Sequence, residues 1–142
     1  EFEAKIKVSG DYKVRFDQAG MMIRQDHENY VKFGIEFVEG KFNISAVVTH
    51  HTSDWSVIEL AEPIPYLWLK AVRRLDAIEL YYSFDDKEYT MMRTLWMQDN
   101  CPLMVGPVAA CPDGQGFKAK FSNFKVKHLP DQRRVEWLKN NQ

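Results

Sequence analysis

The sequence predicts an all-β protein, a sandwich or jelly roll built from antiparallel strands. Within the 142-residue chain, the β-branched and aromatic apolar residues Val, Ile, Phe, Tyr and Trp number 38, against 18 Leu and Ala. Such side chains suit a pleated, half-buried surface. About ten strand-like runs also follow one another at spacings of 8–12 residues, with turn residues between them. That spacing is typical of sandwiches and jelly rolls.

The first two predicted strands lie in residues 2–8 and about 14–24. In the first, the apolar residues Phe2, Ala4, Ile6 and Val8 alternate with the charged residues Glu3, Lys5 and Lys7. This period of two indicates a strand with one buried face. The second run contains Gly20, and a glycine inside a strand marks a bulge or the close approach of another backbone.

Residues 30–49 predict a β-hairpin with Glu39-Gly40 as its two-residue turn. Counting outward from the turn pairs Val38 with Lys41. One face then consists of apolar pairs only: Phe37 with Phe42, Ile35 with Ile44, Phe33 with Ala46, and Val31 with Val48. A slip of one residue would bring polar side chains onto that face, so the turn and the pattern support the same register.

A second hairpin is predicted after Pro63 and Pro65, with its turn at Leu75-Asp76. Its register pairs Ala71 with Leu80 and Leu69 with Tyr82 on one face, and Trp68 with Ser83 and Lys70 with Tyr81 on the other. Further strands are predicted in residues 88–96, 103–110 and 117–127.

The end of the chain is predicted to be helical. Leu129-Pro130 ends the last strand, and Asp131 fits the N-cap of a helix that runs to Asn141. The predicted domain division is therefore a sandwich over residues 1–128 and a C-terminal helix or tail over 129–142. Because the chain opens directly in a strand-like pattern, the first strands of the sandwich are expected upstream of Glu1.

Charge and cysteine content exclude several classes of protein. The net charge is −1, so there is no excess of positive charge to bind nucleic acid or an anionic membrane surface. No run approaches the roughly 18–20 apolar residues of a membrane-spanning helix. We therefore expect neither nucleic acid nor a membrane as a partner. Cys101 and Cys111 are too few for the disulfide framework of a small secreted domain, which favours free thiols and a cytoplasmic location.

No metal or cofactor site is predicted. The adjacent His50 and His51 would point to opposite faces of a strand, and they lack the spacing of a structural zinc site. The oxygen-rich loop 26–29 lacks the spacing of a calcium-binding loop, so it is interpreted as a polar turn. Phosphate-binding loops, dinucleotide fingerprints and the nucleophile elbow of hydrolases are also missing.

Paired carboxylates would indicate a glycosidase, and Glu36 and Glu79 are the candidates on the polar face. Glu36 and Glu39 cannot act as a pair, because they point to opposite sides of a strand. A cross-strand ion pair with Lys32 or Arg24 is a simpler explanation than catalysis for a glutamate at position 36. We therefore predict no catalytic residues.

A polar face that includes aromatic side chains is the remaining functional candidate. Aromatic rings stack on sugar faces while charged groups bind the hydroxyls, so such a face could bind a carbohydrate; an ordinary solvated sheet face is the alternative. Trp55 is instead expected in the core beside Val48. The members of the face are Tyr30, Lys32, Glu36, Asn43, Trp68, Lys70, Glu79 and Tyr81.

Several motifs resemble the domain family named after the regulation-of-enolase protein, within the concanavalin A-like lectin/glucanase superfamily. They are DQAGMMIR (17–24), KFGIE (32–36), VVT (47–49), SDWS (53–56), WLKAVRRLD (68–76), YSFD (82–85) and VGPVAACP (105–112). The resemblance runs from about Phe2 to Val126, with Leu75 in place of the usual Gly and Cys111 in place of the usual Ser. It implies a concanavalin A-like jelly roll and a regulatory role in carbohydrate metabolism. The E-x-D-x-x-E strand of the superfamily's glucanases has no counterpart in residues 34–39.

The sequence thus predicts a non-catalytic cytoplasmic sandwich that binds a carbohydrate-like ligand or a metabolic protein partner. A glycoside hydrolase-like enzyme that uses Glu36 with a second carboxylate is the alternative, and two carboxylates about 5–9 Å apart across a cleft would favour it. The expected ligand-binding residues are Gln18, Arg24, Lys32, Glu36, Trp68 and Tyr81.

Overall fold

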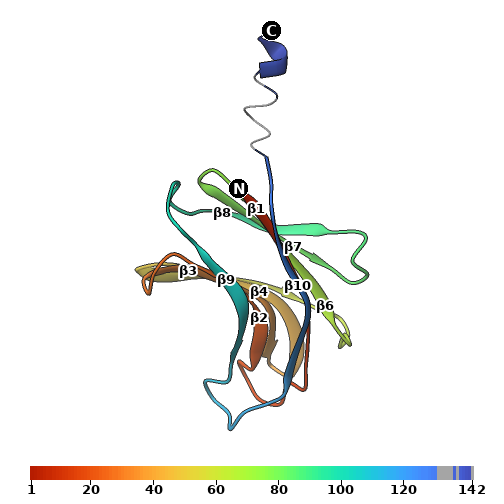
Figure 1. Cartoon of the computed structure of the whole chain (residues 1–142). Helices are drawn as coiled ribbons and strands as arrows, with labels where there is room; N and C mark the ends of the chain where they lie inside the picture. Colours follow the sequence, from red (N-terminus) through yellow and green to blue (C-terminus); the bar gives the residue numbers. More distant parts are fainter. Residues whose placement is uncertain (131–135, 137, 142) are drawn as a thin grey trace.

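The computed structural model describes residues 1–130, 136 and 138–141, and it shows two five-stranded antiparallel sheets packed as a sandwich (Figure 1). The predicted all-β sandwich is confirmed. The β1 sheet has the order β10 (Ala119–His128), β1 (Phe2–Gly10), β6 (Leu67–Arg74), β7 (Ala77–Ser83) and β8 (Thr90–Trp96). The β3 sheet has the order β5 (Thr52–Glu59), β4 (Lys41–His50), β3 (Asn29–Val38), β2 (Gln18–Arg24) and β9 (Met104–Ala110).

The hydrophobic core lies between the two sheets and is built from alternate residues of their central strands. Ile6, Leu69 and Leu80 of the β1 sheet are fully buried, as are Met21 and Ile44 of the β3 sheet. The residues between them in sequence point away from the core, because successive side chains of a strand alternate between its faces. Each sheet therefore has an outward face on which charged and aromatic side chains gather.

Both predicted hairpins form with the expected registers. The β3–β4 pairing runs from Val38 opposite Lys41 to Val31 opposite Val48 and beyond, and the β6–β7 pairing includes Lys70 opposite Tyr81. In the first turn Glu39 and Gly40 both have positive φ, the conformation that a two-residue hairpin of this hand requires. Leu75 in the second turn also has a positive φ, which explains why a glycine would fit this position.

The segment before β2 is a turn, whereas the sequence predicted a strand from about residue 14. The Asp17 carboxylate is fully buried and accepts hydrogen bonds from the backbone N–H groups of Lys13 (2.8 Å) and Val14 (3.0 Å). These contacts bend the chain back on itself, so β2 begins only at Gln18. A short aspartate that binds nearby backbone N–H groups stabilises turns and competes with strand pairing.

Replacing Asp17 by Asn should make stability less dependent on pH. Burial raises the pKa of Asp17, but the two backbone N–H groups and the Cys111 thiol outweigh it and lower the pKa overall. A lowered folded-state pKa contributes stability that is present above the unfolded pKa of about 3.9 and is lost as the pH falls through the folded value. We expect the free energy of unfolding of D17N to be about 1–3 kcal/mol below wild type at pH 7. In urea denaturation the gap should shrink below about pH 4; an unchanged gap would contradict the assignment.

Toward the end of the chain, residues 136 and 138–140 are helical, whereas the predicted N-cap Asp131 lies outside the described residues. Among the described residues, no helix is long and apolar enough to cross a membrane. Cys101 and Cys111 are both free thiols, as the sequence predicted.

Candidate functional site

The outward face of the β3 sheet places polar side chains in lateral rows that follow from the strand registers. One row crosses β2, β3, β4 and β5 at Gln18, Glu36, Asn43 and Glu59, and the next crosses them at Gly20, Gly34, Ser45 and Val57. A third row ends at Trp55 on the edge strand and contains Met22, Lys32 and Val47. The first and third rows supply polar groups, while Gly20, Gly34 and Ser45 of the middle row are small residues between them.

Glu36 is the central polar group of this face, with only 5% of its surface exposed. Its Oε1 accepts a hydrogen bond from the Trp55 indole N–H (3.0 Å), and its Oε2 accepts one from the Gln18 amide (3.2 Å). Burial raises the pKa of Glu36, although the Trp55 N–H, the Lys32 charge and the Ser45 hydroxyl act in the opposite direction. The carboxylate is therefore held in one orientation by neighbours from two other strands.

Trp55 lies at the surface with 51% of the residue exposed, so the expectation that it packs in the core beside Val48 is wrong. The chain reverses around His51, which has a positive φ, and this reversal pairs Trp55 with Val47. Because Val47 is on the outward face, so is Trp55. The indole then reaches Glu36 across β4, where Ser45 is small enough to leave room.

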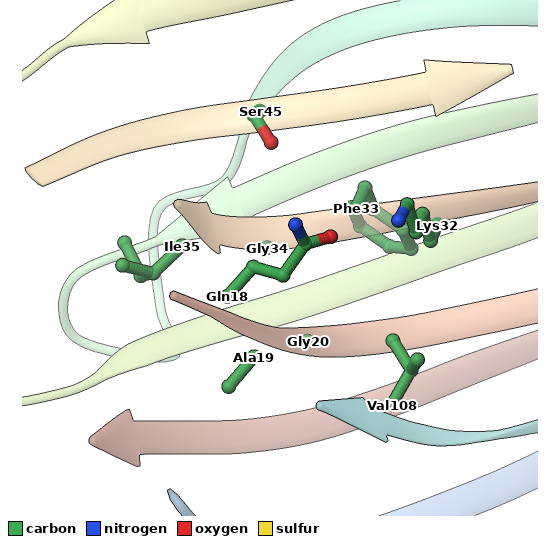
Figure 2. A pocket seen from close by; sticks show the side chains of 9 residues that line it. All are labelled: Gln18, Ala19, Gly20, Lys32, Phe33, Gly34, Ile35, Ser45 and Val108. Atoms are coloured by element: carbon green, nitrogen blue, oxygen red, sulfur yellow. The ribbon is translucent and has the colours of Figure 1, made fainter. Parts of the chain in front are cut away.

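A shallow depression lies beside Glu36, and its floor is formed by two glycines (Figure 2). Gly20 and Gly34 are opposite each other on β2 and β3, and a Cβ atom on Gly34 would lie 2.3 Å from the Ala19 carbonyl oxygen. The Gln18 side chain lies over this floor, and Ser45 lies next to Gly34 on β4. The depression has a volume of about 10 Å³, enough for about one water molecule. A ligand would therefore lie on this face and not inside a deep pocket.

The six expected ligand-binding residues lie on two surfaces. Gln18, Lys32 and Glu36 are grouped at the depression and its hydrogen-bonded rim. Arg24 is on the same outward face but pairs with Tyr30 near the far end of β2, six residues or about 20 Å from Gln18.

Trp68 and Tyr81 instead lie on β6 and β7, on the outward face of the β1 sheet. The sequence correctly paired the strands within each hairpin, but the two hairpins belong to different sheets. Their polar faces therefore point in opposite directions, and the single mixed face that was expected is two separate faces.

The structure also separates the carboxylates proposed as a catalytic pair. Glu79 is on β7 in the β1 sheet, where its Oε2 accepts a hydrogen bond from the Tyr81 hydroxyl (2.6 Å), whereas Glu36 is in the β3 sheet. Within the described part of the chain, Glu36 forms no salt bridge, so the predicted ion pair with Lys32 or Arg24 is wrong. No group of three His, Cys, Asp or Glu that could hold a metal ion occurs among the described residues.

Sequence reasoning missed Trp55, Ser45 and the glycine pair as parts of this site. Gly20 is part of the motif DQAGMMIR and Gly34 is part of the motif KFGIE, but only the β2–β3 register shows that the two glycines face each other. The alternation of polar and apolar residues in the edge strand β5 is weak, because most of its side chains are exposed. A register fixed from the turn at His51 would have placed Trp55 correctly.

These features define a β-sandwich domain with a carboxylate, an amide and an exposed indole joined on the outward face of one sheet. The chain belongs to the family described as "Protein of unknown function (DUF1349)", which matches residues 1–129. The resemblance found in the sequence motifs is confirmed by a relative in Saccharomyces cerevisiae, "Regulation of enolase protein 1". That relative is 31% identical over 125 residues, which make up 88% of this chain and 63% of the relative.

A second relative, "Uncharacterized protein AN7484" from Emericella nidulans, is 26% identical over 121 residues, which are 80% of this chain and 60% of that protein. The chain thus spans less than two thirds of the length of both curated relatives.

Solved structures show the same fold. A functionally unknown protein from Saccharomyces cerevisiae superposes with a TM-score of 0.86 at 30% identity, over 91% of this chain and 70% of that one. A mutant of the GH43 protein BlXynB from Bacillus licheniformis superposes with a TM-score of 0.76 at 21% identity, over 88% of this chain but only 27% of the bacterial protein. The second likeness shows the fold alone.

Proposed function

We propose that this protein is a non-catalytic β-sandwich module that binds a carbohydrate-like ligand on the outward face of the β3 sheet. The observation that carries the proposal is the Trp55–Glu36–Gln18 arrangement, in which the two carboxylate oxygens are held by side chains from two other strands, β5 and β2. An exposed indole offers a flat apolar surface for a sugar ring. The fixed carboxylate beside it can accept hydrogen bonds from sugar hydroxyls with its remaining lone pairs.

Preorganisation supports this role. Glu36 is buried at a site where burial disfavours its charged form, so the fold retains a carboxylate that is costly for stability. Because its two neighbours fix its orientation, little side-chain entropy is lost when a ligand binds. The glycine floor leaves the space next to Gln18 open, so a ring lying against Trp55 can extend over the strands without meeting a side chain at Gly20 or Gly34.

As part of this proposal, the protein acts in the cytoplasm in the regulation of carbohydrate metabolism. The name of the yeast relative, "Regulation of enolase protein 1", supports this role, and two free thiols fit a reducing compartment.

A glycoside hydrolase-like activity of Glu36 is the alternative, favoured by the raised pKa of this carboxyl group, as a general acid requires. Glu59 is on the same face and in the same lateral row as Glu36. It is two strands away, so the backbones at the two residues are about 10 Å apart. It is exposed, sits on the edge strand and pairs with Lys41 at 3.5 Å. Binding is the better-supported function, because the two carboxylates flank a flat face and not a cleft.

A thermal-shift screen with neutral mono- and oligosaccharides tests the proposal. A ligand present at about 100 times its Kd should add roughly 2.7 kcal/mol of stability, which raises the Tm by several degrees. If no saccharide raises the Tm, the site does not bind carbohydrate, and a scaffold that binds only protein becomes the better account. Release of a chromogenic leaving group from aryl glycosides, lost in E36Q and in E59Q, would instead show the hydrolase.

A further inference from the structure

The outward face of the β1 sheet carries a second cluster of charged and aromatic side chains, on the other side of the sandwich from Glu36. The strand registers align Lys125 on β10 with Lys5 on β1 and Lys70 on β6, three neighbouring strands (Figure 1). Adjacent strands are about 4.8 Å apart, so this lysine row (Lys125, Lys5 and Lys70) spans about 10 Å. Like charges directly opposite one another destabilise a sheet, so the lysine row is costly unless an anion compensates it.

Carboxylates of the chain neutralise only part of this charge. Lys5 forms a salt bridge with Asp86 (2.5 Å), whereas Lys70 and Lys125 form none within the described residues. The Lys70 ammonium group lies over the rings of Tyr89 (4.1 Å) and Tyr81 (4.9 Å). A cation–π contact positions an ammonium group without cancelling its charge. The lysine row therefore keeps positive charge available to a ligand.

A pocket lies at the Lys125 end of the lysine row. Its volume is about 550 Å³, which is within the usual range for small-molecule sites of about 300–1,000 Å³. The pocket combines three ammonium groups, two carboxylates, one indole ring and one amide. Lys5 pairs with Asp86 and Lys127 pairs with Glu3 (3.2 Å), so Lys125 is the ammonium group that has no carboxylate partner among the described residues. The residues that line it are Glu3, Lys5, Trp68, Asp86, Asn123, Lys125, Val126 and Lys127.

We propose that this pocket binds a small phosphate monoester, with the phosphate between Lys5 and Lys125 and the remainder of the ligand beside Trp68 and Asn123. Ammonium groups form strong charge-assisted hydrogen bonds with phosphate oxygens, and a dianion relieves the repulsion between two aligned lysines. An extended polyanion fits less well, because Glu3 and Asp86 lie in the same pocket and would repel further phosphates. The site is independent of the Glu36 site, which lies on the other sheet.

Isothermal titration calorimetry with glucose 6-phosphate, inorganic phosphate and glucose, each added to the full chain, tests this proposal. We expect one glucose 6-phosphate per chain, weaker binding of inorganic phosphate, and an affinity for the ester that falls as salt is added. In NMR spectra, glucose 6-phosphate should move the Trp68 indole N–H signal, and glucose should not. No saturable binding of glucose 6-phosphate would overturn the proposal, as would equally tight binding of inorganic phosphate or an unmoved Trp68 signal.

Charge-removing variants separate a specific site from a general field effect. Lys125→Gln should weaken glucose 6-phosphate binding about five- to tenfold, since it removes one charge-assisted contact. Lys41→Gln removes the same charge on the β3 sheet and should change the affinity by less than about twofold. Equal losses in the two variants, or no loss in Lys125→Gln, would contradict the proposed site. Neither variant touches Glu36 or Trp55, so failure here leaves the saccharide site standing.

Discussion

Gly34→Ala should lower the free energy of unfolding by about 2–4 kcal/mol, because the added methyl group meets backbone and not flexible side chains. A Cβ atom on Gly34 would lie 2.3 Å from the Ala19 carbonyl oxygen and 2.6 Å from the Gly20 Cα atom. To relieve this steric clash, β2 and β3 must move apart, which weakens the hydrogen bonds between two central strands of the β3 sheet. Gly20→Ala should behave in the same way, since its Cβ would lie 1.9 Å from the Phe33 carbonyl oxygen.

Gly106→Ala is the matched control for this prediction. Gly106 also lies on an outward-facing strand position of the β3 sheet, but no heavy atom lies within 4 Å of its added Cβ. Its substitution should therefore change the stability by less than about 0.5 kcal/mol. Urea denaturation of the three variants measures these changes in the free energy of unfolding. If G34A is as stable as G106A, the close approach of β2 and β3 does not constrain these positions.

The second large effect is expected on ligand binding. Trp55→Ala should weaken binding of the saccharide found in the screen by roughly 30-fold or more, the loss of about 2 kcal/mol typical of an aromatic anchor. The same substitution leaves Glu36 without its indole donor, so the carboxylate is no longer held in place. Trp96→Ala, which removes an exposed indole from β8 in the other sheet, should leave the affinity unchanged. Equal losses in the two variants would argue against a site at Trp55.

Glu36→Gln should separate binding from stability. Burial raises the pKa of Glu36 in the folded state. The fold therefore loses stability as the pH rises through this folded-state pKa and the carboxyl group ionises, and this loss is absent below the unfolded-state pKa. E36Q should therefore have a Tm at pH 7 equal to or above that of the wild type, while its saccharide affinity falls about tenfold or more. A large loss of stability in E36Q would show that the carboxylate is structural. Glu59→Gln, on the same face, provides the control for the change in charge.

Much of the fold follows from local signals in the sequence. The turn at Glu39-Gly40 and the apolar pairs around it are short-range features, so the β3–β4 register could be derived from them alone. The same reasoning gave the β6–β7 register. Local signals do not show which other strands pair with the free edges of each hairpin, so they do not show which sheet the hairpin joins. For that reason Lys32 and Trp68 were assigned to one face although they lie on opposite sheets.

The site was less predictable than the fold, because its parts meet only through pairings between distant segments. Glu36 and Gln18 were expected binding residues, yet their hydrogen bond depends on the β2–β3 register. Trp55 was misplaced by a single residue, since a tight reversal at His51 was not foreseen. A shift of one residue exchanges the two faces of a strand, so a small error in a turn moved an exposed indole into the predicted core.

The indole N–H signals of the four tryptophans offer the most direct test of the central claim. In 15N-correlated NMR spectra, titration with the saccharide that raises the Tm should shift the Trp55 indole signal, assigned from the Trp55→Ala variant, in a saturable manner. The Trp68 signal should stay in place, because that ring lies on the opposite sheet. Saturable binding that leaves the Trp55 signal unmoved would contradict the proposal that the face around Glu36 is the carbohydrate site.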